Sequence, residues 1–173
     1  LQLQHPQVQA LLTTRLTDAG LPADPAPWVG HGDVSAHALR TLLSDLFGMP
    51  RPAALEIALA VGGHHGRFPS PDDLMRLPSA SLGGAPWDAA RLRITRWLAD
   101  ALDIPTQPPA QTPHSAAMAL AGFVSVVDWI GSSEVFFHHA APDAHTIPAL
   151  DAASYLTDSR GHADEALESL GWT

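Results

Sequence analysis

Two adjacent histidines, His64 and His65, lie among glycines in the segment Gly62-Gly63-His64-His65-Gly66. Neighbouring side chains in a regular helix diverge by about 100°, but flanking glycines allow the backbone to turn so that both imidazoles face one point. Neutral imidazole is the commonest protein ligand for transition metals. The pattern therefore predicts a metal site. The alternative is an ordinary helix end, in which one histidine caps carbonyl groups and the other is exposed.

Two further residues have unusual surroundings. Asp128 interrupts an apolar segment, residues 121–130, that we expect to be fully buried. Because an unpaired buried charge costs several kcal/mol, this carboxylate is expected to be neutral, paired or bound to a metal. Pairing with a buried arginine and capping a helix are the alternatives to metal binding. His31 lies between two glycines just before a predicted helix, where capping or supporting a metal ligand is the simpler interpretation.

The remaining histidines, arginines and serines give weaker signals. We expect the other seven histidines to lie on the surface or at helix ends: His5, His37, His114, His138, His139, His145 and His162. A group of three arginines is expected to form a solvated face rather than a phosphate site: Arg91, Arg93 and Arg96. The serines lack the Gly-x-Ser-x-Gly pattern, which argues against a serine hydrolase.

Composition excludes several classes of protein. All nine basic residues are arginines, so the sequence contains no P-loop or Schiff-base lysine, and it has no cysteine for disulfides or thiolate ligands. The net charge of −9 argues against a broad cationic face, so chemistry on nucleic acid would need a bound metal or a partner. No apolar run approaches the ~20 residues of a membrane span, and the first residues do not resemble a signal peptide. We expect a cytoplasmic protein.

These residues must be positioned by helices, because the apolar periodicity is helical nearly throughout and no alternating strand pattern occurs. Asp33 or Ser35 is expected to cap the second helix, and Ser70 with Pro71 marks a helix start. The pattern predicts one all-α domain over residues 1–173, without repeats. The expected helices cover residues 8–16, 34–47, 54–61, 71–77, 87–102, 115–130 and 148–170, the last either continuous or broken near Gly161.

Three segments taken in order resemble a known family. They are His31-Gly-Asp-Val-Ser35, Ala60-Val-Gly-Gly-His-His-Gly-Arg67 and Gly122-Phe-Val-Ser-Val-Val-Asp-Trp-Ile-Gly-Ser132. They are similar to the HD nuclease domain of the CRISPR-associated helicase–nuclease of type I interference systems, especially the type I-E branch. The closing Leu170-Gly171-Trp172 resembles the end of that domain, just before the helicase begins. The resemblance covers most of the chain.

The resemblance implies an all-α bundle of the HD-domain superfamily and a role for four residues. His31, His64 and His65 match metal ligands, and Asp128 matches the carboxylate on a neighbouring metal. His64, His65 and Asp128 are the implied catalytic residues. Members of this family use two transition metals, typically iron, manganese, nickel or cobalt, to cut single-stranded DNA. The implied partners are single-stranded DNA, a helicase domain and the Cascade surveillance complex, with no membrane.

The sequence departs from the family at its defining motif. No His-Asp dipeptide occurs anywhere in the chain, and Leu1-Gln2-Leu3-Gln4 resembles the segment shortly after that pair. We therefore expect an HD domain truncated at its N-terminus and lacking the helicase, with one metal site at most and weak or no nuclease activity alone. One alternative is an inactive module that docks to Cascade or to another chain. A weaker alternative is an HD phosphohydrolase that acts on nucleotides.

Overall fold

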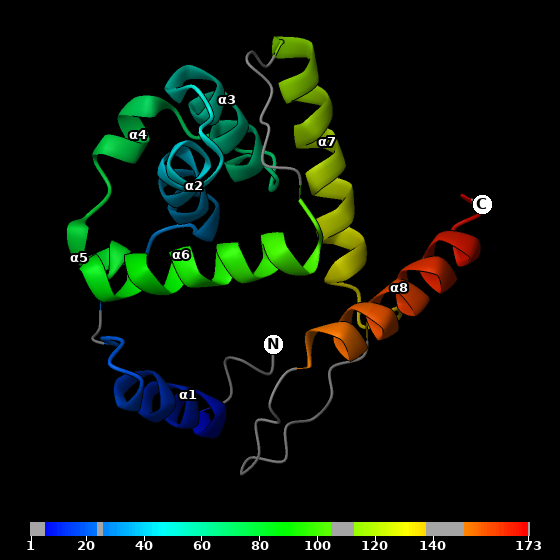
Figure 1. The fold of residues 1–173 in the computed structure, drawn as a ribbon, viewed down its shortest axis with the longest axis horizontal. Helices are drawn as coiled ribbons and strands as arrows, with labels where there is room; N and C mark the ends of the chain where they lie inside the picture. The colour runs from blue at the N-terminus through cyan, green and yellow to red at the C-terminus, as the bar shows by residue number, and fades with distance from the viewer. Residues whose placement is uncertain (1–5, 24–25, 105–112, 138–150, 173) are drawn as a thin grey trace. The chain divides into compact units, whose positions relative to one another are not determined.

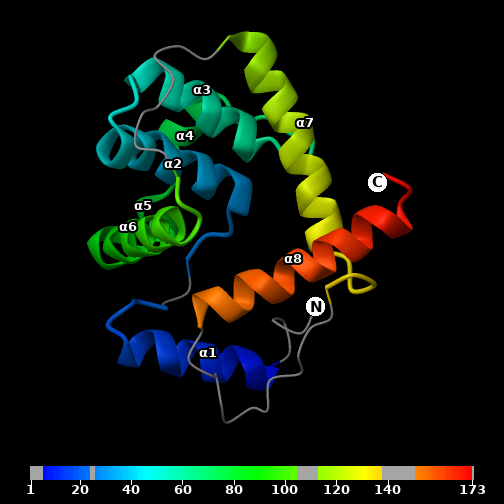
Figure 2. The same ribbon diagram turned by 45° about the vertical axis from the view of Figure 1, so that its right-hand side comes forward.

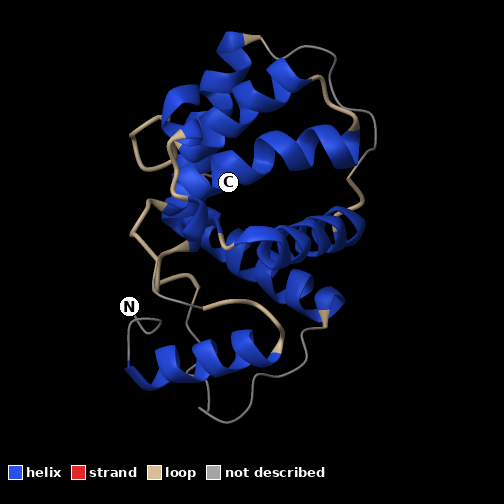
Figure 3. Ribbon diagram, turned by 90° about the vertical axis from the view of Figure 1, so that its left-hand side faces the viewer, coloured by secondary structure: helices blue, strands red, loops and turns tan. Residues whose placement is uncertain are grey.

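The computed structural model describes residues 6–23, 26–104, 113–137 and 151–172 (Figure 1). Within these ranges the chain forms helices joined by loops and contains no strand (Figure 3). The all-α fold class predicted from the sequence is confirmed. The helices are α1 (Pro6–Asp18), α2 (His31–Phe47), α3 (Arg51–Gly62), α4 (Pro71–Met75), α5 (Ser79–Leu82), α6 (Gly84–Ala101), α7 (His114–Gly131) and α8 (Ala152–Ser169).

The chain divides into two compact units. The larger unit consists of residues 13–125, and the smaller one of residues 1–12 together with residues 126–173. The larger unit contains all of α2 to α6 and the first part of α7, whereas the smaller one contains α8. The single domain over residues 1–173 stays a prediction, and the two units are described separately.

The larger unit is built on α2 and α3, which lie side by side with α4 next to them (Figures 1 and 2). Ala36 of α2, Ala58 of α3 and Leu74 of α4 form a buried cluster with almost no exposed surface. Small residues at this crossing allow the helices to approach closely. A Cβ atom on Gly32 would collide with the carbonyl oxygen of Gly62. The beginning of α2 therefore lies directly against the end of α3.

The predicted helices are present, most of them with ends that differ by one to three residues from the prediction, and the predicted cap of α2 needs a correction. Its N-cap is Gly30, and no side chain caps it, so the predicted caps Asp33 and Ser35 are wrong. The carboxylate of Asp33 accepts hydrogen bonds from Arg67 instead. Ser70 does cap α4, because its hydroxyl accepts a hydrogen bond from the amide of Asp73 in a capping box.

Several boundaries differ from the prediction, among them the starts of α2 and α3, which each come three residues early. Helix α6 begins at Gly84, three residues before the expected start, and α4 ends at Met75, two residues before its expected end. The four-residue α5 is too short to give a periodic signal. Helix α8 runs unbroken through Gly161, and the expected positions 148–150 lie outside the described residues.

Helix α7 is more exposed than its sequence predicts. Ala117 and Ala121 pack with Ala60 of α3 in a small buried cluster. Farther along, Phe123 is 64% exposed and Asp128 is half-buried, so the expectation of a fully buried segment is wrong. By length and composition α7 also qualifies as a membrane span, which differs from our expectation. That criterion is weak, because the core helix of a soluble protein meets it too.

Candidate metal centre

Three histidines converge in the larger unit. His31 is the first residue of α2, and His64 and His65 lie in the turn that follows α3. The Nε2 atom of His31 is 3.0 Å from Nε2 of His64 and 2.9 Å from Nε2 of His65. One nitrogen from each of the three rings lies within 4.8 Å of the others. The structure therefore brings together all three histidines that the resemblance matches to metal ligands.

Glycines at the end of α3 make this convergence possible. Gly63 is the C-cap of α3, and a Cβ atom on it would collide with the ring of Phe68. Gly66 has a φ of +84°, a left-handed conformation that side chains with a Cβ rarely adopt, and its amide donates to the Gly63 carbonyl at 2.8 Å. The tight turn aims His64 and His65 at the same point, as their spacing predicts. The alternative of a helix cap is also represented, since the ring of His64 contacts the Val61 carbonyl at the end of α3 and His65 is exposed.

A backbone hydrogen bond fixes the proton of His64. Its Nδ1 lies 2.7 Å from the carbonyl oxygen of Val61, and only an N–H can form this bond because a carbonyl oxygen accepts. In the neutral ring the proton is then on Nδ1, and Nε2 presents a lone pair to His31 and His65. Metal-binding histidines usually have this arrangement, with the second ring nitrogen donating to a carbonyl or carboxylate.

The three ring nitrogens do not satisfy one another by hydrogen bonding. Nε2 of His31 is within hydrogen-bonding distance of Nε2 of both His64 and His65. A ring nitrogen either donates or accepts a hydrogen bond, and a donating N–H points directly at only one partner. If Nε2 of His31 accepts a proton from His65, its lone pair is occupied, and the lone pair of His64 is left without a donor from His31. A single cation satisfies all three lone pairs together.

The distances also suit a transition metal. Two ring nitrogens bound to one ion at about 2.1 Å and at right angles to each other are separated by about 3 Å. This separation matches the measured Nε2–Nε2 distances of 2.9 and 3.0 Å. Three imidazoles and no thiolate favour iron, nickel, zinc or copper over calcium or magnesium. The residues present therefore fit a divalent transition-metal ion.

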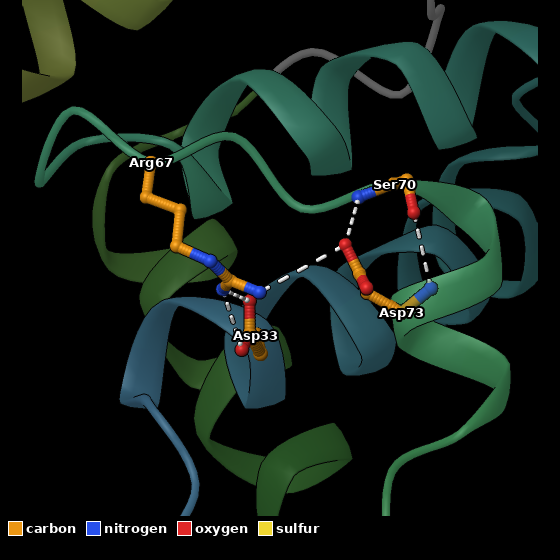
Figure 4. Close-up of polar contacts among 4 residues, drawn as sticks. All are labelled: Asp33, Arg67, Ser70 and Asp73. Atoms are coloured by element: carbon orange, nitrogen blue, oxygen red, sulfur yellow. Dashed lines mark hydrogen bonds and ion pairs between the residues drawn. The ribbon is translucent and has the colours of Figure 1, made fainter.

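A charged network supports the turn that carries two of the histidines (Figure 4). Nη1 of Arg67 donates to both carboxylate oxygens of Asp33 at 3.1 Å, and its other terminal nitrogen lies 3.8 Å from Asp73. The amide of Ser70, followed by its hydroxyl, lowers the pKa of Asp73 below its usual value. Arg67 thus connects the histidine turn to the first turn of α2 and to the start of α4.

A cavity of about 650 Å³ opens beside the histidines. His31, His65, Asp33, Arg67 and Trp28 are among the residues that line it, and all of them belong to the larger unit. Its volume falls within the range of sites that hold small ligands. Two of the candidate ligands, His31 and His65, therefore border a space large enough for a small ligand.

The fourth residue matched by the resemblance, Asp128, is not in the histidine cluster of the larger unit. It lies on α7 in the part of that helix assigned to the smaller unit. Within α7 it follows Ala121 by seven residues, which puts both on nearly the same helix face, about 10 Å apart along the axis. Its role stays a prediction.

The other candidate histidines and arginines lie elsewhere. His114 is exposed and its Nδ1 is 3.3 Å from a carboxylate oxygen of Glu56, whereas His162 contacts the ring of Phe137. His37 is half-buried rather than solvent-facing, which corrects the prediction. Arg93 and Arg96 are exposed as expected, but Arg91 is mostly buried and bonded to Asp88 and the Leu82 carbonyl. The other histidines, at positions 5, 138, 139 and 145, lie outside the described residues.

Sequence reasoning missed the roles of Arg67, Asp33 and Trp28. Asp33 and Arg67 stand within the segments that resemble the family, yet nothing in their spacing showed that they pair. Trp28 follows a proline-rich connector, and a large aromatic residue three positions before a candidate ligand was the available signal.

The larger unit is a helical fold with a candidate metal site of three histidines, and comparison with known proteins specifies the family. Residues 2–137 match the family model described as "Cas3, HD domain". The chain belongs to this family, as its sequence motifs predict. The match also favours the CRISPR interpretation over the nucleotide phosphohydrolase.

Relatives and solved structures agree with this assignment. The chain is 29% identical over 167 residues to the CRISPR-associated endonuclease/helicase Cas3 of Thermus thermophilus, covering 91% of this chain and 17% of that protein. A crystal structure of a CRISPR-associated protein matches with a TM-score of 0.90 and 44% identity over 99% of this chain and 19% of the other. The Thermus thermophilus Cas3 HD domain, crystallised in the presence of Ni²⁺, matches with a TM-score of 0.65 and 29% identity over 84% of this chain and 59% of the other.

These matches confirm the HD-type fold and show how much of the longer proteins the chain represents. It spans less than a fifth of the length of the Thermus thermophilus endonuclease/helicase. The metal-ligand cluster lies within the region matched by the family model.

Proposed function

We propose that this chain is a metal-dependent nuclease domain that cuts single-stranded DNA in type I CRISPR interference, an antiviral defence in the cytoplasm. The observation that carries the proposal is the convergence of one ring nitrogen from each of His31, His64 and His65 on one point, at separations that suit a single bound cation. Support comes from the related protein named an endonuclease/helicase and from the related HD domain crystallised with Ni²⁺.

In the proposed site, the three histidines hold one divalent ion of iron, manganese, nickel or cobalt. Such an ion acts as a Lewis acid and lowers the pKa of bound water. The chain's own contribution is orientation: the Val61 carbonyl holds the His64 ring, and Arg67 holds the histidine turn against α2. Because the protein is acidic, the bound cation also supplies the charge that attracts a phosphodiester.

Asp128 is the proposed carboxylate of the reaction, together with His64 and His65 as catalytic residues. Asp128 is half-buried on α7. A carboxylate oxygen is the ligand type that a second ion beside an imidazole site would require.

The proposed stoichiometry for these 173 residues alone is one ion per chain, with weak cleavage. The chain contains no His-Asp dipeptide, so a second ion would need ligands from another segment. In the complete domain we propose two ions about 3.5–4 Å apart. A segment with further ligands, a helicase domain and the Cascade complex are the proposed partners.

Calorimetric titration with Ni²⁺ or Mn²⁺ tests the metal site. We expect one tight site per chain, lost in His64→Ala and retained in His114→Ala, an exposed control in the same unit. Two tight sites would contradict the single ion, and no site would contradict the proposed function. Cleavage of a labelled single strand with Mn²⁺ then tests the reaction, which should be slow and should disappear in His64→Ala.

A second candidate is a module that docks to Cascade or to another chain without cutting DNA. It is favoured by exposed apolar side chains on α7, among them Met118, Phe123 and Trp129. A pull-down with purified Cascade distinguishes the two functions. Binding that survives in His64→Ala, combined with no cleavage by the wild type under any metal, would favour the docking module.

A further inference from the structure

Trp28 is an exposed aromatic residue beside the metal ligands. It is 90% exposed, more than any other tryptophan in the described residues. Its indole makes no hydrogen bond or ring contact there, in contrast to Trp87, whose indole N–H donates to the Pro22 carbonyl at 2.7 Å. Trp28 therefore contributes nothing visible to the packing of the larger unit.

The backbone that carries Trp28 is nevertheless fixed. The hydroxyl of Ser81 in α5 donates to the Pro27 carbonyl at 2.7 Å, one residue before Trp28. The bond from Trp87 holds the beginning of the same connector at Pro22. Trp28 is followed within three residues by His31 and the start of α2. The anchored backbone therefore fixes the point from which the indole extends, which limits the conformational entropy lost when a base binds.

Trp28 shares its cavity with groups that suit a nucleotide. The cavity of about 650 Å³ is lined by the indole, by the metal ligands His31 and His65, and by Arg67. The side chain of Arg67 is 67% exposed, so its guanidinium remains reachable although it pairs with Asp33. An aromatic face beside a cationic site matches the two parts of a nucleotide, which are a flat base and a charged phosphate.

We propose that Trp28 is a stacking platform for one base of a single-stranded nucleic acid whose phosphate lies at the three-histidine site. The inference rests on the proposed nuclease function, because it names where the bound strand places a base. Stacking on an indole accepts every base, since each has an aromatic face. It also compensates for the acidity of the protein, because stacking needs no positive charge on the protein surface.

The test measures binding of a fluorescein-labelled oligothymidylate of about 12 nucleotides to the Ni²⁺-loaded 173-residue chain by anisotropy, with the strand checked for intactness on a gel. Trp28→Ala should raise the Kd about tenfold. Trp28→Phe should restore most of the affinity, and Trp172→Ala, an exposed tryptophan on the smaller unit, should leave it unchanged. Calorimetry with Ni²⁺ should show the same metal affinity in all four proteins.

An abasic nucleotide moved along the strand identifies the stacked base. At one position it should weaken binding to the wild type about tenfold and leave binding to Trp28→Ala unchanged, because the stacking partner is already missing. Independent losses from the two changes would overturn the proposal, as would wild-type affinity in Trp28→Ala or a loss of Ni²⁺ affinity in that variant. If the wild type does not bind the single-stranded oligonucleotide, both the stacking role and the proposed nuclease function are wrong. If the wild type binds and Trp28→Ala binds equally, only the stacking role is wrong.

Discussion

Helix α2 carries two histidines with opposite environments. His31, the first residue of the helix, has its Nε2 next to the rings of His64 and His65, and in the described part of the chain no hydrogen bond brings a donor from another kind of residue to that nitrogen. Six residues later, Nδ1 of His37 accepts a hydrogen bond from Arg40 at 3.3 Å, and the ring also bonds to the backbone of Leu74. Asp88 and Arg91 of α6 border the same site.

The difference shows what makes a histidine a candidate ligand. A lone pair that already accepts a proton from a guanidinium is not free for a metal, and two nearby cations repel one. Among the described residues, no hydrogen bond joins a guanidinium to the rings of His31, His64 or His65, and the nearby Arg67 pairs with Asp33 and Asp73. His31 and His37 are both histidines close to other polar groups. The property that separates them is whether the ring nitrogens of several histidines lie together with no N–H donor from another kind of residue bonded to them.

Removal of a converging ring should have the largest effect. His64→Ala deletes one of three ligands and should weaken Ni²⁺ binding by more than about a hundredfold, because loss of even a supporting residue around a metal typically costs 10- to 100-fold. His37→Ala should leave the metal affinity unchanged. Calorimetric titration of both variants measures this contrast. Equal losses in the two would show that the lone-pair argument is wrong.

The close crossing of α2 and α3 should be the next most sensitive feature. Gly32→Ala places a methyl group against the Gly62 carbonyl, and we expect it to lower the free energy of unfolding by about 1–3 kcal/mol. Gly122→Ala is the matched control, because a Cβ there meets nothing within 4 Å. It should be neutral or raise stability by up to about 1 kcal/mol.

Urea denaturation of both glycine variants gives the comparison. The metal affinity of Gly32→Ala should fall as well, since separation of the helices moves His31 away from His64. A stable Gly32→Ala variant with full metal affinity would contradict the close approach.

Helix positions were largely predictable because their signals are local. The capping box at Ser70 and the left-handed glycine at Gly48 each depend on a few neighbouring residues. The predicted cap Asp33 failed for a non-local reason, since its partner Arg67 is 34 positions away and reaches it only after α2 and α3 have packed. The exposed side of α7 was missed because an apolar sequence alone does not reveal how much of its surface finds a partner.

The three histidines of the candidate metal site were also predictable in part, like the helix positions. The glycines around His64 and His65 predicted that the pair turns toward one point, and the structure confirms it. His31 taken alone favoured a supporting role, and only the resemblance identified it as a ligand. Its membership of the cluster depends on the helix crossing at Gly32 and Gly62, which no local pattern encodes.

Removal of the Arg67 guanidinium should have a smaller effect, and it should lower the metal affinity without lowering the stability of the fold. Arg67→Met should weaken Ni²⁺ binding about tenfold, in line with the loss of a supporting residue around a metal. Exposed ion pairs contribute only about 0–1 kcal/mol to folding, so the unfolding midpoint should change little. Arg76→Met is the control, because Arg76 forms a similarly exposed pair with Asp72 away from the histidines.

Arg67→Lys should recover part of the metal affinity, since lysine keeps the charge near Asp33 but lacks the second terminal nitrogen that lies 3.8 Å from Asp73. If Arg67→Met lowers both stability and metal affinity, Arg67 supports the fold as a whole and not the histidine site in particular.

The pH dependence of His37 should give the smallest effect and tests the other side of the comparison. Burial lowers the pKa of His37, and Arg40 lowers it further, whereas the Leu74 backbone and Asp88 act in the opposite direction and Arg91 lowers it again. With a folded pKa below the unfolded one, the unfolded chain binds more protons between the two values. The stabilisation is therefore complete above about pH 6.5, the ordinary pKa of histidine, and falls as the pH drops toward the folded pKa.

Urea denaturation of metal-free wild type and His37→Gln between pH 5 and 7.5 isolates this contribution, since the amide cannot titrate. The wild type should lose more stability than the variant as the pH falls below about 6.5. Identical pH profiles would mean that the folded protein tolerates a charged ring beside Arg40. The contrast between His37 and the cluster of His31, His64 and His65 would then not rest on the charge state of the ring.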